Sequence, residues 1–96
     1  MPWTGNDLPW NRSAILLQVP ADSGVYAIWR HTTCIYVGAT YDLQRRLLEH
    51  FNGSNACIIQ AQPTSFGFEL SSGIRRVERQ SLLFRELSPM CNRACP

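Results

Sequence analysis

The stretch GVYAIWRHTTCIYVG, residues 24–38, predicts two short strands joined by a polar turn. Apolar and aromatic residues alternate before the turn and resume after it, which is typical of a β-hairpin. If the turn holds three or five residues, strand pairing puts Tyr26 and Tyr36 on the same face. We expect the opposite face to be wholly apolar and covered by another element; its residues are Val25, Ala27, Trp29, Ile35 and Val37.

Two glycines, Gly24 and Gly38, frame the two tyrosines. Their missing side chains leave room for another group to approach the backbone. Taken alone, the pattern favours a half-buried aromatic pair in a small sheet. The motifs in order add a second interpretation, because GVY at 24–26 and YVG at 36–38 resemble the two motifs of the GIY-YIG nuclease family. The spacing of ten residues between the tyrosines is also similar to that of the family.

The resemblance extends from Gly24 to Asn92, which is most of the chain. It implies a small α/β (α+β) domain with a three-stranded, mainly antiparallel sheet flanked by helices. It also implies a metal-dependent endonuclease that hydrolyses phosphodiester bonds of DNA. Fold-level resemblance does not establish activity, so the chemistry must be argued from the site.

The composition is that of one small domain, which we assign to residues 1–96. Its 96 residues are 45% hydrophobic and 17% charged, enough to bury a modest core. The apolar runs are too short to span a membrane, and the N-terminus lacks the layout of a signal peptide. We therefore expect an intracellular protein, cytoplasmic or nucleoid-associated, without a membrane partner. The sequence does not predict an oligomeric state.

All nine basic residues are arginines, and the net charge is +2. This balance permits nucleic-acid binding without requiring it. Selection for bidentate phosphate contacts and a GC-rich coding sequence explain the absence of lysine equally well. The four cysteines include no CxxC pair, so free thiols are more strongly expected than a zinc site; they are Cys34, Cys57, Cys91 and Cys95.

Residues 1–12 are rich in proline, glycine and asparagine, which predicts an irregular arm. We expect Trp3 and Trp10 to pack onto the body of the domain, because a flexible tail rarely carries two large aromatic side chains. Residues 13–19 are compatible with a short helix or an edge strand, and the pattern does not decide between them.

A helix is predicted within residues 40–53, where Thr40 or Asp42 can cap the N-terminus and Asn52-Gly53 ends it. Arg46 and His50 are four residues apart and flank its apolar stripe, which consists of Leu43, Leu47, Leu48 and Phe51. From the pattern alone, a solvated basic face is the simpler interpretation. The resemblance implies that Arg46 is the arginine following the second motif and that His50 takes a position often held by histidine or tyrosine.

Residues 54–64 predict a loop with a short ordered piece, and Phe66, Phe68 and Leu70 alternate as in a third strand. A second helix is predicted over residues 74–87, with Ser71 or Ser72 as its cap and Pro89 after its end. At about 100° per residue, the inward stripe is predicted to hold Gln80 at its centre among Ile74, Val77, Leu83, Phe84 and Leu87.

The glutamine at this position departs from the family. The resemblance implies a metal-binding glutamate nine residues before a proline, which is followed three residues later by an asparagine; Pro89 and Asn92 match, and the count reaches Gln80. Three explanations compete: an engineered Glu-to-Gln variant, a naturally degenerate member that only binds, or a register change that brings in Glu78. Helix geometry disfavours the third, because Glu78 and Gln80 point about 160 to 200° apart.

For an active form, the resemblance implies the following roles. Tyr26 or Tyr36 acts as general base toward a water molecule, helped by the other phenol or by His50. Arg46 stabilises the phosphate. One Mg²⁺ or Mn²⁺ is held by a carboxylate in the place of Gln80, because an amide is a weaker ligand for a hard cation.

Asn92 is expected to orient a group in the site or to fix the end of the helix. DNA is the expected partner, contacted by Arg45, Arg46, Arg76 and Arg79. Two rival functions remain open: a nucleic-acid-binding module without catalysis, and a protein interaction domain that uses Trp3, Trp10 and Trp29.

Overall fold

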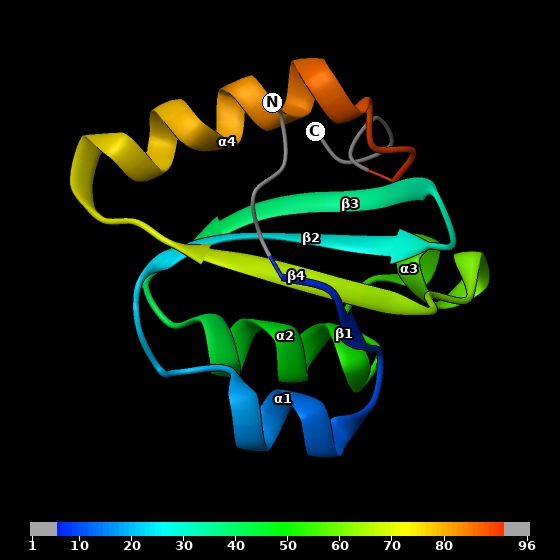
Figure 1. The fold of residues 1–96 in the computed structure, drawn as a ribbon. Coiled ribbons are helices and arrows are strands. Elements are labelled where there is room, and N and C mark those ends of the chain that lie inside the picture. Colours follow the sequence, from blue (N-terminus) through cyan, green and yellow to red (C-terminus); the bar gives the residue numbers. More distant parts are fainter. Residues whose placement is uncertain (1–5, 92–96) are drawn as a thin grey trace.

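A four-stranded antiparallel sheet lies at the centre of the fold, with helices on both faces (Figure 1). The structure is a computed structural model and describes residues 6–91. The elements in chain order are β1 (Leu8–Pro9), α1 (Arg12–Gln18), β2 (Gly24–Arg30), β3 (Thr33–Thr40), α2 (Leu43–Phe51), α3 (Ala56–Ala61), β4 (Ser65–Leu70) and α4 (Gly73–Leu87). The predicted fold class is confirmed, with one strand more than expected.

The additional strand is β1, in the arm predicted to be irregular. The strand order is β1-β4-β2-β3, and Leu8 pairs with Phe66 while Pro9 pairs with Ser65. The prediction of an irregular arm is wrong at these positions. Proline cannot donate to a sheet and weakens the sequence signal of a strand, but an edge position tolerates it.

The tyrosine hairpin, β2 and β3, reaches the predicted alignment by a different route. Arg30 pairs with Thr33, so the turn holds only two residues, and the register then shifts at a bulge between Ile28 and Trp29. A bulge adds one unpaired residue to one strand. It restores the parity that an odd-length turn would have given, and Ile28 therefore lies opposite Tyr36.

The bulge divides the residues near the turn differently from the prediction. Tyr26, Ile28 and Tyr36 belong to one core cluster, on what we call the tyrosine face of the sheet, and Ile35 joins them. The prediction that Ile35 lies on the opposite face is wrong, because Ile35 is the extra residue of the bulge and Cys34 replaces it beside Trp29. Helices α1, α2 and α3 contribute to the tyrosine-face core (Figure 1).

The predicted space beside the two glycines is filled by the protein itself. A side chain at Gly38 would collide with the ring of Tyr26, and one at Gly24 would collide with the backbone of Glu69 and with Leu43. The glycines therefore let neighbouring groups of the domain approach, and no ligand space remains beside them.

Helix α4 covers the other face, which we call the α4 face (Figure 1). Val25, Ala27 and Val37 pack there against Leu83, as expected for a wholly apolar face. The predicted inward stripe of α4 is shifted, however, since Ile74 is 75% and Val77 is 55% exposed. The helix is turned so that Arg76 is buried instead. The residues of α4 that join the core on this face are Leu83, which is fully buried, and Leu87, which is partly buried.

The ambiguous segment at residues 13–19 is helical and forms most of α1. Asn11 caps it, since its Oδ1 accepts a hydrogen bond from the backbone N–H of Ala14 at 2.7 Å. Trp10 packs against Phe51 and Phe66 with ring centroids 5.6 and 5.7 Å apart, which confirms its predicted packing. Predictions for Trp3, Asn92 and Cys95 lie outside the described residues.

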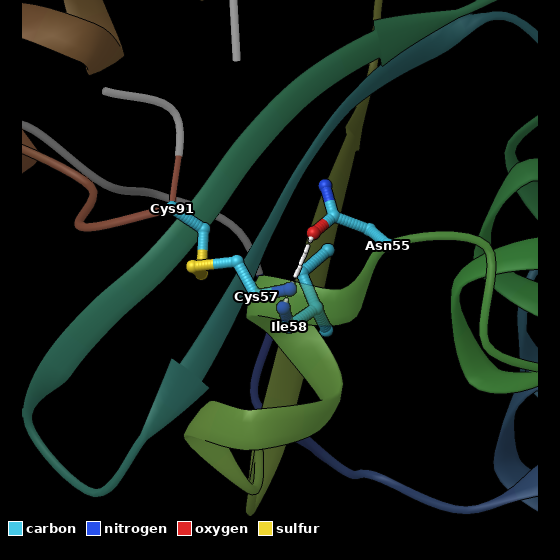
Figure 2. The surroundings of a disulfide bond; sticks show 4 residues. All are labelled: Asn55, Cys57, Ile58 and Cys91. Atoms are coloured by element: carbon cyan, nitrogen blue, oxygen red, sulfur yellow. Dashed lines mark hydrogen bonds between the residues drawn. A yellow bond between two sulfur atoms is a disulfide. The ribbon is translucent and has the colours of Figure 1, made fainter. Parts of the chain in front are cut away.

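A disulfide joins the two layers around the outer edge of β3. Met90 and Cys91 donate backbone hydrogen bonds to the carbonyls of Cys34 and Ile35 at 3.2 and 2.8 Å, so the chain after α4 runs along β3. Cys91 then bonds to Cys57 of α3, whose first turn is capped by the Asn55 side chain (Figure 2). The prediction of free thiols is wrong for this pair.

The third described cysteine, Cys34, remains a buried thiol. Burial raises its pKa to about 12, so it is not a reactive thiolate near neutral pH. Within residues 6–91, no helix is long and apolar enough to cross a lipid bilayer.

Candidate active site

The centre of the site is a buried hydrogen bond between Tyr26 of β2 and His50 of α2. The Tyr26 hydroxyl lies 2.8 Å from His50 Nε2, and each residue is 1% exposed. Asp42 begins α2 by accepting a hydrogen bond from Arg45 N, as predicted. From that start, His50 falls seven residues after the buried Leu43, on the same side of the helix. His50 therefore lies in the apolar stripe that it was predicted to flank.

The environment keeps both partners of this pair uncharged at neutral pH. Burial, with a smaller contribution from the charge of Arg46, lowers the pKa of His50 to about 4. Burial also raises the pKa of the Tyr26 phenol above its usual range, and the neighbouring Tyr36 adds to this, while Arg46 opposes it. His50 Nδ1 has no hydrogen-bond partner among the described residues. The hydrogen bond therefore joins two neutral groups, and the imidazole tautomer decides which of them donates.

Tyr36 connects this buried pair to the surface. Its ring stacks on Tyr26 with centroids 6.0 Å apart, and it lies 4.9 Å from the His50 ring. Because Tyr36 stands on the edge strand β3 and is only half-buried, its side chain is the more accessible of the two phenols. The structure brings three of the predicted site residues together here.

Arg46 adds a positive charge beside the aromatic cluster. Its guanidinium donates to Glu49 Oε1 at 2.8 Å, and this ion pair is the main cause of its raised pKa. The guanidinium also acts on both phenols, since Tyr26 and Tyr36 each contribute to raising the pKa of Arg46. Glu49 additionally pairs with Arg45 at 3.4 Å. Glu49 was not among the residues predicted for the site, although its spacing of three and four residues from the arginines is a known helix-pair signal.

A shallow cleft of about 260 Å³ opens beside Arg46. Its walls come from the end of β3 and the first turns of α2, which carry both arginines of that helix. A guanidinium that is only partly engaged by a carboxylate can still bind a phosphate at such a cleft. The lining residues are Thr40, Tyr41, Asp42, Arg45, Arg46 and Glu49.

Gln80 lies on the other layer of the molecule. It is half-buried on α4, which covers the α4 face. Helix α4 is continuous across Gln80 and Glu78, and the exposed Glu78 lines a separate cleft with Arg79. The role predicted for Gln80 stays a prediction.

The part of the chain that the structure describes has no ligand cluster for a divalent cation. No group of three or more histidine, cysteine, aspartate or glutamate side chains within residues 6–91 could hold a metal ion. Glu49, the carboxylate next to His50 in α2, is already paired with two arginines. An amide at Gln80 supplies no charge to offset the desolvation of a hard cation.

The two arginines predicted on α4 are engaged within the domain. Arg76 is 8% exposed and donates to Ser23 Oγ at 2.6 Å, so we do not assign it to direct DNA contact. Arg79 donates two hydrogen bonds to the carboxylate of Glu69 at 2.8 and 3.0 Å. Arg45 is the most exposed arginine beside the cleft.

Comparison with known proteins identifies the family and the fold. The family model of the GIY-YIG catalytic domain matches residues 22–80. The N-terminal GIY-YIG endonuclease domain of UvrC from Thermotoga maritima, bound to magnesium, superposes with a TM-score of 0.73 at 23% identity, covering 84% of this chain and 93% of that one. An asparagine-to-alanine mutant of the same domain gives a TM-score of 0.72 at 22% identity over 82% and 90% of the two chains. No curated protein matches the sequence.

Proposed function

Because the chain belongs to the GIY-YIG catalytic domain family, we propose that it is a DNA endonuclease domain that binds a phosphodiester at the Arg46 cleft but is disabled by Gln80. The observation that carries this proposal is the contact of Tyr26, His50 and Tyr36 beside the Arg46 guanidinium. Burying a phenol and an imidazole that are only partly hydrogen-bonded lowers the stability of the fold, so a functional role explains why the pair is present. The UvrC domain of similar fold is an endonuclease domain with a catalytic divalent cation.

Tyr36 is the better candidate for the general base. Tyr26 is fully buried and its raised pKa keeps the phenol protonated, so it cannot take a proton from a solvent water at neutral pH. Tyr36 is half-exposed and stacked on that pair. We assign Tyr26 and His50 to positioning the Tyr36 ring, and Arg46 to stabilising the charge on the phosphate.

Hydrolysis needs a partner for the leaving oxygen, and this chain offers an amide where the family has a carboxylate. A divalent cation bound by glutamate would neutralise that oxygen when present. With Gln80, we expect cation affinity and cleavage to be low while phosphate binding persists. The prediction that Mg²⁺ or Mn²⁺ supports activity therefore applies to the Gln80→Glu form.

A plasmid nicking assay tests the proposal. Supercoiled DNA is incubated in Mg²⁺ or Mn²⁺ with this chain or with Gln80→Glu, and the nicked product is quantified. We expect Gln80→Glu to nick at least about 100-fold faster. Loss of a hydrogen bond that supports a metal ligand lowers activity by about 10- to 100-fold, and loss of the ligand itself should lower it more. Chelation should abolish the nicking.

Matched variants in the Gln80→Glu background identify the site. Arg46→Ala should reduce nicking to the background level, whereas Arg85→Ala, which removes an exposed arginine from the far end of α4, should not change it. Tyr36→Phe should slow nicking by about 100-fold or more. Equal effects of the two arginine variants would contradict the assignment.

A non-catalytic nucleic-acid-binding module is the second candidate, favoured by the lack of a metal-ligand cluster within residues 6–91. Binding without nicking by both this chain and Gln80→Glu would support it. If neither this chain nor Gln80→Glu binds or nicks DNA, the remaining explanation is a protein interaction domain. A cytoplasmic or nucleoid-associated location stays a prediction, and the Cys57–Cys91 disulfide is more typical of an oxidising compartment.

A further inference from the structure

Tyr41 is a large aromatic residue that the proposed chemistry does not use. It is 79% exposed, between the end of β3 and the start of α2, and it lines the Arg46 cleft. Most exposed aromatic side chains lose rotamer freedom when they bind a ligand. Tyr41 differs from that case because one face of its ring is already in contact with a held cation.

The cation is Arg76 of α4. Its guanidinium carbon lies 4.0 Å from the centroid of the Tyr41 ring, which is a cation–π contact. Arg76 is itself fixed, because it donates to Ser23 Oγ at 2.6 Å and Ser23 Oγ donates to the carbonyl of Ser71 at 2.6 Å. The chain of contacts orders one face of the Tyr41 ring and leaves the rest of the side chain open to solvent.

The structural alternative is that Tyr41 only shields Arg76 from water. The ring itself remains 79% exposed, and Arg76, which is 8% exposed, is also held by its hydrogen bond to Ser23 Oγ. An ordered aromatic face beside positive charge is instead the arrangement by which proteins stack single-stranded bases.

The charges around the ring suit a nucleotide. Arg45 and Arg46 line the same cleft as Tyr41, and the Arg45 side chain is 77% exposed. A phosphate at these guanidinium groups leaves the adjoining base near Tyr41. In an intact duplex that base is stacked between its neighbours, and only an unpaired or unstacked base can lie against a protein ring.

We propose that Tyr41 is a stacking platform for an unpaired nucleobase adjoining the phosphodiester at Arg46, so that the domain prefers gapped or single-stranded DNA to intact duplex. This inference rests on the proposed DNA-binding function and adds a structure preference to it. Tyr41 selects the form of the substrate and takes no part in proton transfer.

The test compares two DNA probes of equal length at one fixed salt concentration. One is a duplex with a three-nucleotide gap that carries 2-aminopurine at its centre, and the other is the fully paired duplex. Anisotropy gives the Kd, and quenching of 2-aminopurine fluorescence reports stacking. We expect Tyr41→Ala to weaken binding of the gapped probe by about 5- to 100-fold and to abolish the quenching, without changing duplex binding.

Four further variants separate stacking from other effects. Tyr41→Phe keeps the ring and should bind the gapped probe like the unaltered chain, whereas Tyr41→Leu keeps apolar volume and should behave like Tyr41→Ala. Arg45→Ala removes a phosphate contact and should weaken both probes alike. Leu17→Ala, at a position that is 84% exposed on α1, should change neither.

The outcomes distinguish this inference from the function on which it rests. If the unaltered chain binds neither probe, the proposed function fails. If it binds DNA and Tyr41→Ala leaves the preference for the gapped probe unchanged, or weakens both probes equally, the stacking role alone is overturned. Loss of the preference with Tyr41→Ala and its retention with Tyr41→Phe establish the role.

Discussion

The two faces of the sheet solve different problems. On the α4 face, Val25, Ala27 and Val37 meet Leu83 in an apolar contact that serves stability. On the tyrosine face, a phenol and an imidazole are buried among apolar residues and satisfy only part of their hydrogen-bonding capacity. Apolar residues of similar size would stabilise that face at least as well. The tyrosine face holds the larger apolar core and also buries the polar pair that we assign to the site, whereas the cluster on the α4 face is smaller and apolar.

Separating the two layers should have the largest effect. The Cys57–Cys91 disulfide joins α3 to the segment after α4 over a sequence separation of 34 residues. By the entropy of loop closure, Cys57→Ser should lower the free energy of unfolding by about 4 kcal/mol, measured by urea denaturation.

The reductant provides the control for this measurement. The unaltered chain in dithiothreitol should fall to the stability of Cys57→Ser, while the variant should not respond to reductant. An unaltered chain whose stability is the same with and without reductant would mean that the bond does not form in solution.

The second-largest effect is expected from acid, which should destabilise the tyrosine face through protonation of His50. The pKa of His50 is lowered from 6.5 to about 4, so the folded state binds its proton later than the unfolded state as the pH falls. Stability from this group is complete above pH 6.5 and is lost between pH 6.5 and 4, with a total loss of up to about 3 kcal/mol.

Denaturation at several pH values tests this expectation. The part of the pH dependence that lies in that window should disappear in His50→Leu. It should persist in Leu83→Ala, which weakens the α4 face without touching a titrating group. A His50→Leu variant with an unchanged pH profile would show that His50 is not the titrating group.

Making the tyrosine face resemble the α4 face should have a moderate effect. Tyr26→Phe leaves His50 Nε2 without its partner and should cost about 1 to 3 kcal/mol of unfolding free energy. The double variant Tyr26→Phe with His50→Leu removes both polar groups, so its cost should be smaller than the sum of the single costs. Strict additivity in this double-mutant cycle would contradict a coupled pair.

The smallest effect is expected at the exposed side of α4. Val77→Ala should change the free energy of unfolding by no more than about 0.5 kcal/mol, because the side chain is 55% exposed. Leu83→Ala, six residues later and fully buried, should cost about 2 to 5 kcal/mol. Similar losses of unfolding free energy at both positions, measured by denaturant unfolding, would mean that Val77 faces the core as the sequence predicted.

The family and the fold class followed from short motifs, and both are confirmed. Periodicity also predicted α2 with its Asp42 cap. It predicted the extent of α4 and the burial of Leu83 but not the orientation of its first half, where Ile74 and Val77 are exposed and Arg76 is buried in contact with Ser23 and Tyr41. Such contacts join residues far apart in the chain, and no local pattern encodes them.

Long-range pairing limited the remaining predictions in the same way. Cys57 and Cys91 carry no spacing that distinguishes a disulfide from two thiols. The approach of Tyr26 to His50 depends on how α2 docks on the sheet, which hydrophobic spacing constrains only to one side of the helix.

The residues between Ile28 and Tyr36 of the tyrosine hairpin are divided between the turn and the bulge in β3, and sequence comparison sees only their total number. Moving the extra residue out of β3 and into the turn would give a three-residue turn and a regular ladder, with Tyr26 still opposite Gly38. Only Cys34 and Ile35 would exchange layers. The distance in sequence between the two motifs therefore constrains the sum of turn and strand residues, and related chains with dissimilar hairpin tips can present the same pair of phenols.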